Sequence, residues 1–163
     1  DVAMRVKEPR QAALIRKPLM NIRMRLYASP GYLARNGTPQ DLSEICQHRL
    51  ICQNPRAAQV GAGASLVQHI LAHEIRSTLT VNNYFGVLQG VLNDLGIGVL
   101  PHYLINDFPD LVQVLPDVES VEVPVFLAYP EELRHSKRIA AFRDFVQEEI
   151  ISYRKQARNQ AVG

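Results

Sequence analysis

The feature that most constrains the fold is a strand–helix–strand unit at residues 79–101. Residues 79–81 (Leu-Thr-Val) are typical of a strand, and Asn82-Asn83 can cap a following helix. Apolar residues then recur at helical spacing and form one stripe: Val87, Leu88, Val91, Leu92 and Leu95. Gly96 stands where a helix stop is expected, residues 97–100 predict a buried strand, and Pro101 opens a further helix. The order requires a crossover, so we expect an α/β domain with a partly parallel sheet.

Strand-like runs also occur at residues 2–6, 13–19, 22–28, 49–52, 111–115 and 121–128. Residues 22–28 alternate in polarity. The pattern predicts one buried face and one exposed face, with these members: Ile22, Met24, Leu26 and Ala28 buried, and Arg23, Arg25 and Tyr27 exposed.

Helical signals stand between these strands. Ser29 and Pro30 predict the N-cap and first residue of a short helix that ends at Asn36-Gly37. Thr38-Pro39 predicts the start of another helical turn that reaches Ile45. We expect a loop at residues 53–63 and a helix at residues 65–76. Ser136 predicts the start of a last helix, frayed beyond residue 156, with an apolar face at helical spacing: Ile139, Phe142, Val146, Ile150 and Tyr153.

The two long strand-like runs, 22–28 and 121–128, frame the middle of the sequence. If both pass between two lobes, residues 21–124 form a central lobe. Residues 1–20 and 125–156 then form part of an outer lobe, and residues 157–163 a disordered tail. This two-crossover layout is what a hinged binding protein needs.

Composition excludes several classes of protein. Of 163 residues, 47% are apolar and 21% charged, which is enough for a core and typical of a globular domain. The net charge of +2 is too small for a strong nucleic-acid footprint. Cys46 and Cys52 form no CxxC motif and fit a reducing compartment. The charged start and the lack of a long apolar run predict a cytoplasmic protein without membrane contact.

Several short motifs together resemble one protein family. They are LYASPGYL at residues 26–33, GTP at 37–39, HRLI at 48–51, LTVNN at 79–83, LGIGVLP at 95–101, LVQVLP at 111–116, YP at 129–130, SKRI at 136–139 and FRDF at 142–145. In this order and spacing, over about residues 1–150, they are similar to the effector-binding domain of LysR-type transcriptional regulators.

This resemblance implies a periplasmic-binding-protein-like (type II) fold, with two α/β lobes, two crossover strands and an outer lobe that is incomplete here. It implies binding of a small metabolite, often a small carboxylate, and assembly into a homodimer or homotetramer. The family's N-terminal helix-turn-helix, linker helix and first half of the outer lobe would precede Asp1. Contact with DNA is therefore expected only through that absent helix-turn-helix.

Candidate effector-binding residues follow the predicted strands. They are Asn82, Asn83, Tyr84 and Phe85 at one strand–helix turn, Cys52 and Gln53 at the end of a second strand, and Pro101 at a third. Ligands of open α/β sheets bind at such strand ends, and helix N-termini suit anions. The alternatives stay open: Asn82 or Asn83 only caps the helix, Phe85 packs in the core, Gln53 starts an ordinary polar loop, and Pro101 only opens a helix.

The sequence contains no complete motif that is typical of an enzyme. His69 and His73, at positions i and i+4, could ligate a metal, but no third ligand is evident, and solvated or packed histidines fit as well. The glycines at 61 and 63 lack the GK[ST] of a P-loop. We therefore expect no enzyme activity, catalytic residue, metal or cofactor. The runner-up function is a solute-binding protein of the same fold that serves a transporter.

An incomplete outer lobe would leave apolar surface uncovered, above all on the last helix with Ile139, Phe142, Val146 and Ile150. We therefore predict that the 163-residue chain, expressed alone, self-associates. Sedimentation velocity checks this, and a monodisperse, stable monomer would contradict it.

Overall fold

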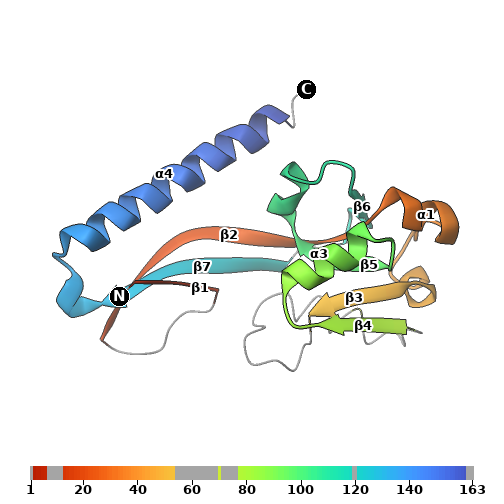
Figure 1. Cartoon of the computed structure of the whole chain (residues 1–163), viewed down its shortest axis with the longest axis horizontal. Helices are drawn as coiled ribbons and strands as arrows, with labels where there is room; N and C mark the ends of the chain where they lie inside the picture. The colour runs from red at the N-terminus through yellow and green to blue at the C-terminus, as the bar shows by residue number, and fades with distance from the viewer. Residues whose placement is uncertain (1, 7–12, 54–69, 71–76, 119–120, 161–163) are drawn as a thin grey trace. The chain divides into compact units, whose positions relative to one another are not determined.

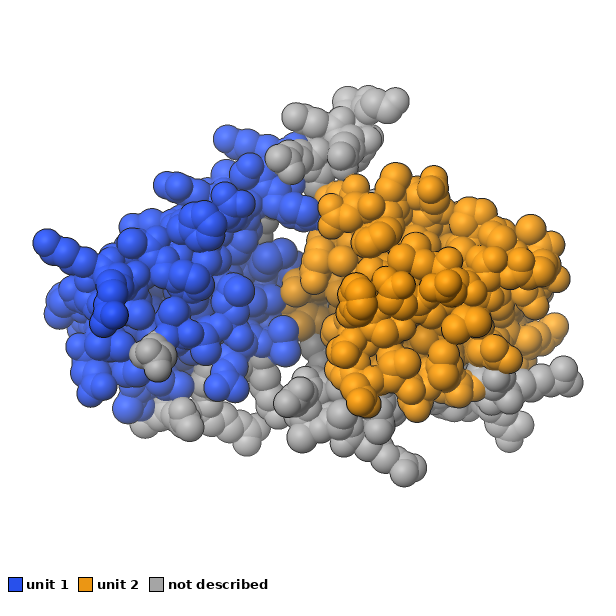
Figure 2. Space-filling model, in the orientation of Figure 1, with its two compact units in different colours: residues 1–21, 124–163 blue, residues 22–123 orange. Residues whose placement is uncertain are grey.

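The computed structural model describes residues 2–6, 13–53, 70, 77–118 and 121–160. The chain divides into two compact units, shown in different colours in Figure 2. Unit 1 consists of Asp1–Asn21 and Pro124–Gly163, and unit 2 of Ile22–Val123. Each unit is described by itself.

The described strands form a mixed, seven-stranded sheet (Figure 1). Its order is β1 (Ala3–Arg5), β7 (Val121–Pro130), β2 (Leu14–Ala28), β5 (Ile97–Pro101), β3 (Arg49–Gln53) and β4 (Ser77–Val81), and β6 (Val112–Val114) pairs with β2. β3 runs parallel to β4 and β5, whereas β5 and β6 are antiparallel to β2. The predicted mixture of helices with a partly parallel sheet is confirmed. β2 and β7 each contribute residues to both units.

The predicted strand–helix–strand unit is present in unit 2 as β4, α3 (Tyr84–Leu92) and β5. α3 packs closely on the sheet because glycines stand at the contacts. A Cβ on Gly98 would lie 2.4 Å from a methyl carbon of Val91, and one on Gly90 would lie 2.9 Å from Cδ1 of Ile51. Larger residues at either position would push the helix off the strands.

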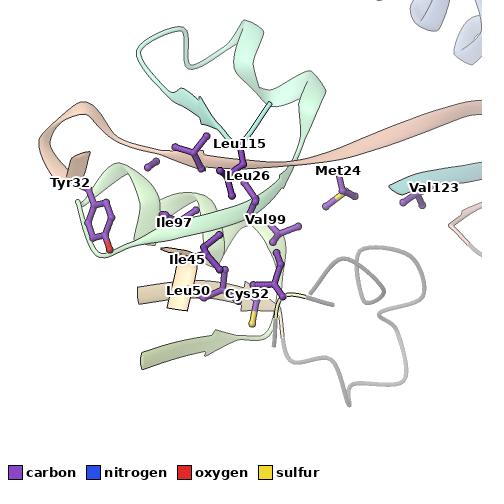
Figure 3. Packing of buried hydrophobic residues seen from close by; sticks show 13 residues of the cluster. Met24, Leu26, Tyr32, Ile45, Leu50, Cys52, Ile97, Val99, Leu115 and Val123 are labelled. Carbon is purple, nitrogen blue, oxygen red and sulfur yellow. The ribbon is translucent and has the colours of Figure 1, made fainter. Parts of the chain in front are cut away.

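Unit 2 has two clusters of buried apolar residues. The first cluster (Figure 3) includes Met24, Leu26, Ala28, Tyr32, Ile45, Leu50, Cys52, Ile70, Ile97, Val99, Val114, Leu115 and Val123. The second consists of Tyr27, Ile51, Val87, Leu88, Val91, Leu100 and Leu111. Neighbouring residues of β2, β3 and β5 alternate between the two clusters, so the sheet of unit 2 is covered on both faces.

This double burial corrects the one-sided pattern predicted for residues 22–28. Met24, Leu26 and Ala28 are buried as expected, but Tyr27 is also buried, at 2% exposure. Its neighbours on the same face, Arg23 and Arg25, are not fully buried. The polarity pattern predicted an exposed Tyr27 because it lies on the same face as two arginines. Its ring is instead part of the second apolar cluster, beneath α3.

Gly96 is not the helix stop that the sequence predicts. α3 ends at Leu92, and its last carbonyls accept from the backbone N–H groups of Asn93, Asp94 and Leu95. Asp94 takes the left-handed conformation, with φ 60°, which Asp tolerates better than most residues. Gly96 is needed for a different reason: a Cβ there would lie 2.4 Å from the carbonyl oxygen of Arg49.

The first helix agrees with prediction and the next differs. In α1 (Pro30–Asn36), Ser29 is the N-cap and accepts from the Tyr32 N–H, and Gly37 ends the helix with φ 81°. The turn expected from Thr38 to Ile45 is instead a 3₁₀ helix, η1 (Glu44–Gln47), that begins later. The Asp41 carboxylate accepts from the N–H groups of Ser43 and Glu44, so the helical turn starts at this side chain rather than at Pro39.

Unit 1 contains β1, parts of β2 and β7, the 3₁₀ helix η3 (Glu131–Leu133) and the long helix α4 (Lys137–Gln160). Its core comprises Leu127, Tyr129 and Ile139, with Val2, Ile15, Leu19 and Leu133 packed against them. On the predicted apolar face of α4, Ile139 and Val146 are buried, whereas Phe142 is 37% exposed.

α4 continues to Gln160, beyond residue 156, where we expected fraying and a disordered tail from residue 157. No proline or glycine occurs between Ser136 and Gly163, and cations favour helix C-termini. Within the described residues, no helix has the length and apolar character needed to cross a membrane.

A buried tyrosine–histidine contact joins α1 to the start of β3. The Tyr32 hydroxyl lies 3.2 Å from Nδ1 of His48 and accepts from the Arg49 N–H at 3.1 Å. His48 is 7% exposed. Burial lowers its pKa from 6.5, and the nearby Glu44 carboxylate opposes that shift.

This contact predicts a stability that depends on pH. Because the pKa of His48 is lower in the folded state, the unfolded chain binds more protons as the pH falls through 6.5. The free energy of unfolding should therefore decrease between about pH 7.5 and about pH 5.5. Urea unfolding of wild type and His48→Gln at both values measures this, and the variant should show the smaller decrease. Equal decreases would show that His48 does not contribute.

Candidate functional site

The carboxyl ends of three parallel strands meet at one edge of unit 2. β3 ends at Gln53, β4 at Val81 and β5 at Pro101, and β3 lies between the other two. In the register of β3 and β4, Gln53 stands opposite Val81. We call this region the carboxyl edge. Open α/β sheets bind ligands at such edges, because helix N-termini and turn residues gather there.

Two of the predicted site residues are joined by a hydrogen bond at the carboxyl edge. Nε2 of Gln53 donates to the backbone oxygen of Asn82 over 2.9 Å. The bond links the end of β3 to the turn between β4 and α3. The structure therefore brings Gln53 together with the turn of residues 82–85. Asn54, the next residue, lies outside the described residues.

Asn83 is the N-cap of α3. Its backbone is extended, with φ −153° and ψ 165°, and its Oδ1 accepts from the Gly86 N–H at 2.8 Å. The capping alternative is thus confirmed for Asn83. Capping does not exclude binding, because Oδ1 accepts one N–H, while the first turn of a helix has several and carries a partial positive charge.

The two aromatic residues after the cap differ in burial. Tyr84 is half-buried and packs against the first apolar cluster. Burial raises its pKa, and the nearby phenol of Tyr103 raises it further. Phe85 is 69% exposed, so the alternative that it packs in the core is wrong. An exposed phenylalanine at the carboxyl edge gives this turn an apolar surface beside its polar groups.

Cys52 and Pro101 do not present their side chains at the surface. Cys52 is fully buried in the first cluster, and burial raises the pKa of its thiol. This corrects the prediction of Cys52 as a lining residue: its side chain alternates with that of Gln53 and points into the core. Pro101 is also buried and precedes the 3₁₀ helix η2 (His102–Asn106), as the helix-opening alternative predicts.

Two exposed residues follow Pro101: His102, which the sequence places at this strand end without selecting it as a binding residue, and Tyr103, which was not a candidate. His102 and Tyr103 begin η2, and both are exposed. The signal was present, because they directly follow the third parallel strand.

A family model of the LysR substrate-binding domain matches residues 1–150. The chain therefore belongs to the LysR substrate-binding domain family. The resemblance inferred from the ordered motifs is confirmed.

Curated relatives agree with this assignment. The chain is 28% identical over 154 residues to the HTH-type transcriptional regulator CrgA of Neisseria meningitidis, and the match covers 92% of this chain and 51% of that protein. It is 26% identical over 151 residues to an uncharacterized HTH-type transcriptional regulator, YhjC, of Escherichia coli, with 90% and 50% covered. The chain thus spans about half the length of the curated relatives it matches.

Solved structures show the same fold. The regulatory domain of CrgA superposes with a TM-score of 0.72 at 24% identity, and the match covers 91% of this chain and 74% of that one. Full-length AphB of Vibrio cholerae gives a TM-score of 0.67 at 23% identity, with 91% and 51% covered. The predicted periplasmic-binding-protein-like α/β fold is confirmed.

The cap and any binding role of Asn83 can be separated. Asn83→Ala removes the acceptor for the Gly86 N–H and should lower the free energy of unfolding by about 1 kcal/mol. Asn83→Asp retains a capping oxygen and should leave stability close to that of wild type. Thermal or urea unfolding of both variants checks this. If both lose stability equally, the amide makes contacts beyond the cap.

Proposed function

We propose that the carboxyl edge of unit 2 binds a small-molecule effector, and that this chain is the effector-sensing part of a LysR-type transcriptional regulator. The observation that carries the proposal is the convergence of three parallel strand ends on the Gln53–Asn82 hydrogen bond and the N-terminus of α3. Membership of the LysR substrate-binding domain family supports it.

Each group at this edge has a role in the proposal. The first turn of α3 offers backbone N–H donors to an anionic group, and the helix dipole favours negative charge there. The Gln53–Asn82 bond holds the turn in place, and Asn83 fixes the direction in which α3 begins. Tyr84 and Phe85 supply apolar surface. Cys52 and Pro101 contribute through the backbone, since their side chains are buried.

The two-lobe organisation is part of the same proposal. β2 and β7 each contribute to both compact units, and in a hinged domain such strands carry the movement. The domains are 1–20 with 125–156, as part of the outer lobe, and 21–124 as the central lobe. Effector binding would change how these lobes are held.

The activity of the whole protein is inferred from its relatives. CrgA is named an HTH-type transcriptional regulator, and we infer that this chain acts with an N-terminal helix-turn-helix that contacts DNA. We further propose that it works in the cytoplasm as a homodimer or homotetramer and catalyses no reaction. The alternative function, a solute-binding protein that serves a transporter, is not supported, because the named relatives are transcriptional regulators.

The proposal predicts stabilisation by a metabolite. A ligand at a hundred times its dissociation constant should raise the free energy of unfolding by about 2.7 kcal/mol. Thermal unfolding of the intact protein, with and without the low-molecular-mass fraction of its own cells, measures this.

Asn83→Asp is the matched variant for that experiment. It retains the cap but places a carboxylate where an anion would bind, so the stabilisation should disappear. An intact protein that no fraction stabilises, and that binds no specific DNA, would exclude the proposed function.

A further inference from the structure

Tyr27 and His102 form a close pair in unit 2. The Tyr27 hydroxyl lies 2.6 Å from Nδ1 of His102, and the two rings stack with centroids 6.4 Å apart and planes 16° apart. Tyr27 is 2% exposed and belongs to the second apolar cluster, beneath α3. His102 is exposed and directly follows the carboxyl end of β5. The pair thus joins a core residue of β2 to a surface residue of the carboxyl edge.

The contact with Tyr27 favours one tautomer of His102. A buried hydroxyl needs an acceptor for its proton, and in the described part of the chain Tyr27 reaches Nδ1 of His102. Burial raises the pKa of Tyr27 to about 12, so the hydroxyl stays protonated and can donate. A neutral imidazole that accepts at Nδ1 carries its proton at Nε2.

Neighbouring cations favour the neutral ring. Burial, then Arg25 and then Arg23 lower the pKa of His102. Arg23 is paired with Glu122 at 3.1 Å, which offsets its charge. Arg25 donates to the backbone oxygens of Val118 and Pro116, at 2.9 and 3.3 Å, and these uncharged partners leave its positive charge in place. An N–H donor in such a field suits a negatively charged acceptor.

We infer that His102 is a further binding residue of the carboxyl edge, whose Nε2–H donates to a carboxylate of the effector, and that Tyr27 is the positioning residue that fixes its tautomer. The inference rests on the proposed function. It extends the site from the turn of residues 82–85 to the start of η2 and assigns a side-chain donor to the carboxylate of the ligand.

The surroundings of His102 indicate the rest of the ligand. Tyr103, the next residue, is 38% exposed, and it lies near enough to Tyr84 to affect the pKa of that phenol. An apolar ring on a ligand whose carboxylate accepts from His102 would therefore lie beside aromatic side chains of both η2 and the turn before α3.

Benzoate is the probe, and benzamide is its neutral match in shape. Isothermal titration calorimetry on the intact protein should show benzoate binding at least about tenfold more tightly than benzamide. His102→Leu should weaken benzoate binding by about tenfold or more, and His102→Gln, which keeps a donor near the position of Nε2, should recover part of the loss.

Tyr27→Phe tests the positioning role, and Tyr32→Phe is its matched control. Both variants remove a hydroxyl that contacts Nδ1 of a histidine within unit 2. Tyr27→Phe should weaken benzoate binding severalfold, whereas Tyr32→Phe should leave it unchanged even where it lowers stability. ¹⁵N NMR of labelled histidines should show the Nε2–H tautomer of His102 in wild type and a mixture in Tyr27→Phe.

The remaining outcomes separate this inference from the proposed function. Equal benzoate binding by wild type and His102→Leu, with loss in Asn83→Asp, would overturn the inference and leave the effector site in place. Absence of benzoate binding by wild type, or an Nδ1–H tautomer, would also overturn it. The metabolite fraction tests the proposed function independently.

Discussion

The packing of α3 on β3 and β5 is the contact on which the rest of unit 2 depends. It requires glycine at positions 90 and 98, where a side chain would meet Ile51 or Val91. With the helix held this close, its first turn begins at the ends of the parallel strands. Asn83 can then cap the helix beside the Gln53–Asn82 bond, and the carboxyl edge forms as a consequence of the core.

A second set of contacts ties this edge to β2, which contributes to both units. The Tyr27 hydroxyl contacts Nδ1 of His102, and Arg25 donates to a backbone oxygen in the segment after β6. Arg23 forms an ion pair with Glu122 on β7. All three arginine and tyrosine side chains lie on the same face of β2. A ligand that contacts His102 would therefore act on groups anchored to the two strands shared between the units, which is what a sensing domain requires.

Much of this fold was predictable because local signals were strong. The cap and proline at Ser29-Pro30, the apolar stripe of α3 and the run of residues 97–100 each have one structural interpretation. The errors arose where tertiary contacts decide. The Asp41 carboxylate places the start of a helical turn later than Pro39. α3 ends before Gly96, with Asp94 in the left-handed conformation. The Tyr27 side chain is buried on a face of β2 that was predicted to be exposed. Within the candidate site, Asn82, Asn83 and Gln53 lie together as the strand order suggested. The sequence did not select His102 as a binding residue, because its contact with Tyr27 joins residues that are 75 positions apart in sequence.

Hydrogen–deuterium exchange of the intact protein, with and without the low-molecular-mass fraction of its cells, tests the central claim most directly. If the carboxyl edge is the effector site, the fraction should slow exchange at the first turn of α3, at the end of β3 and at the start of η2. Protection confined to α4 or to other parts of unit 1, or no protection anywhere, would contradict the account.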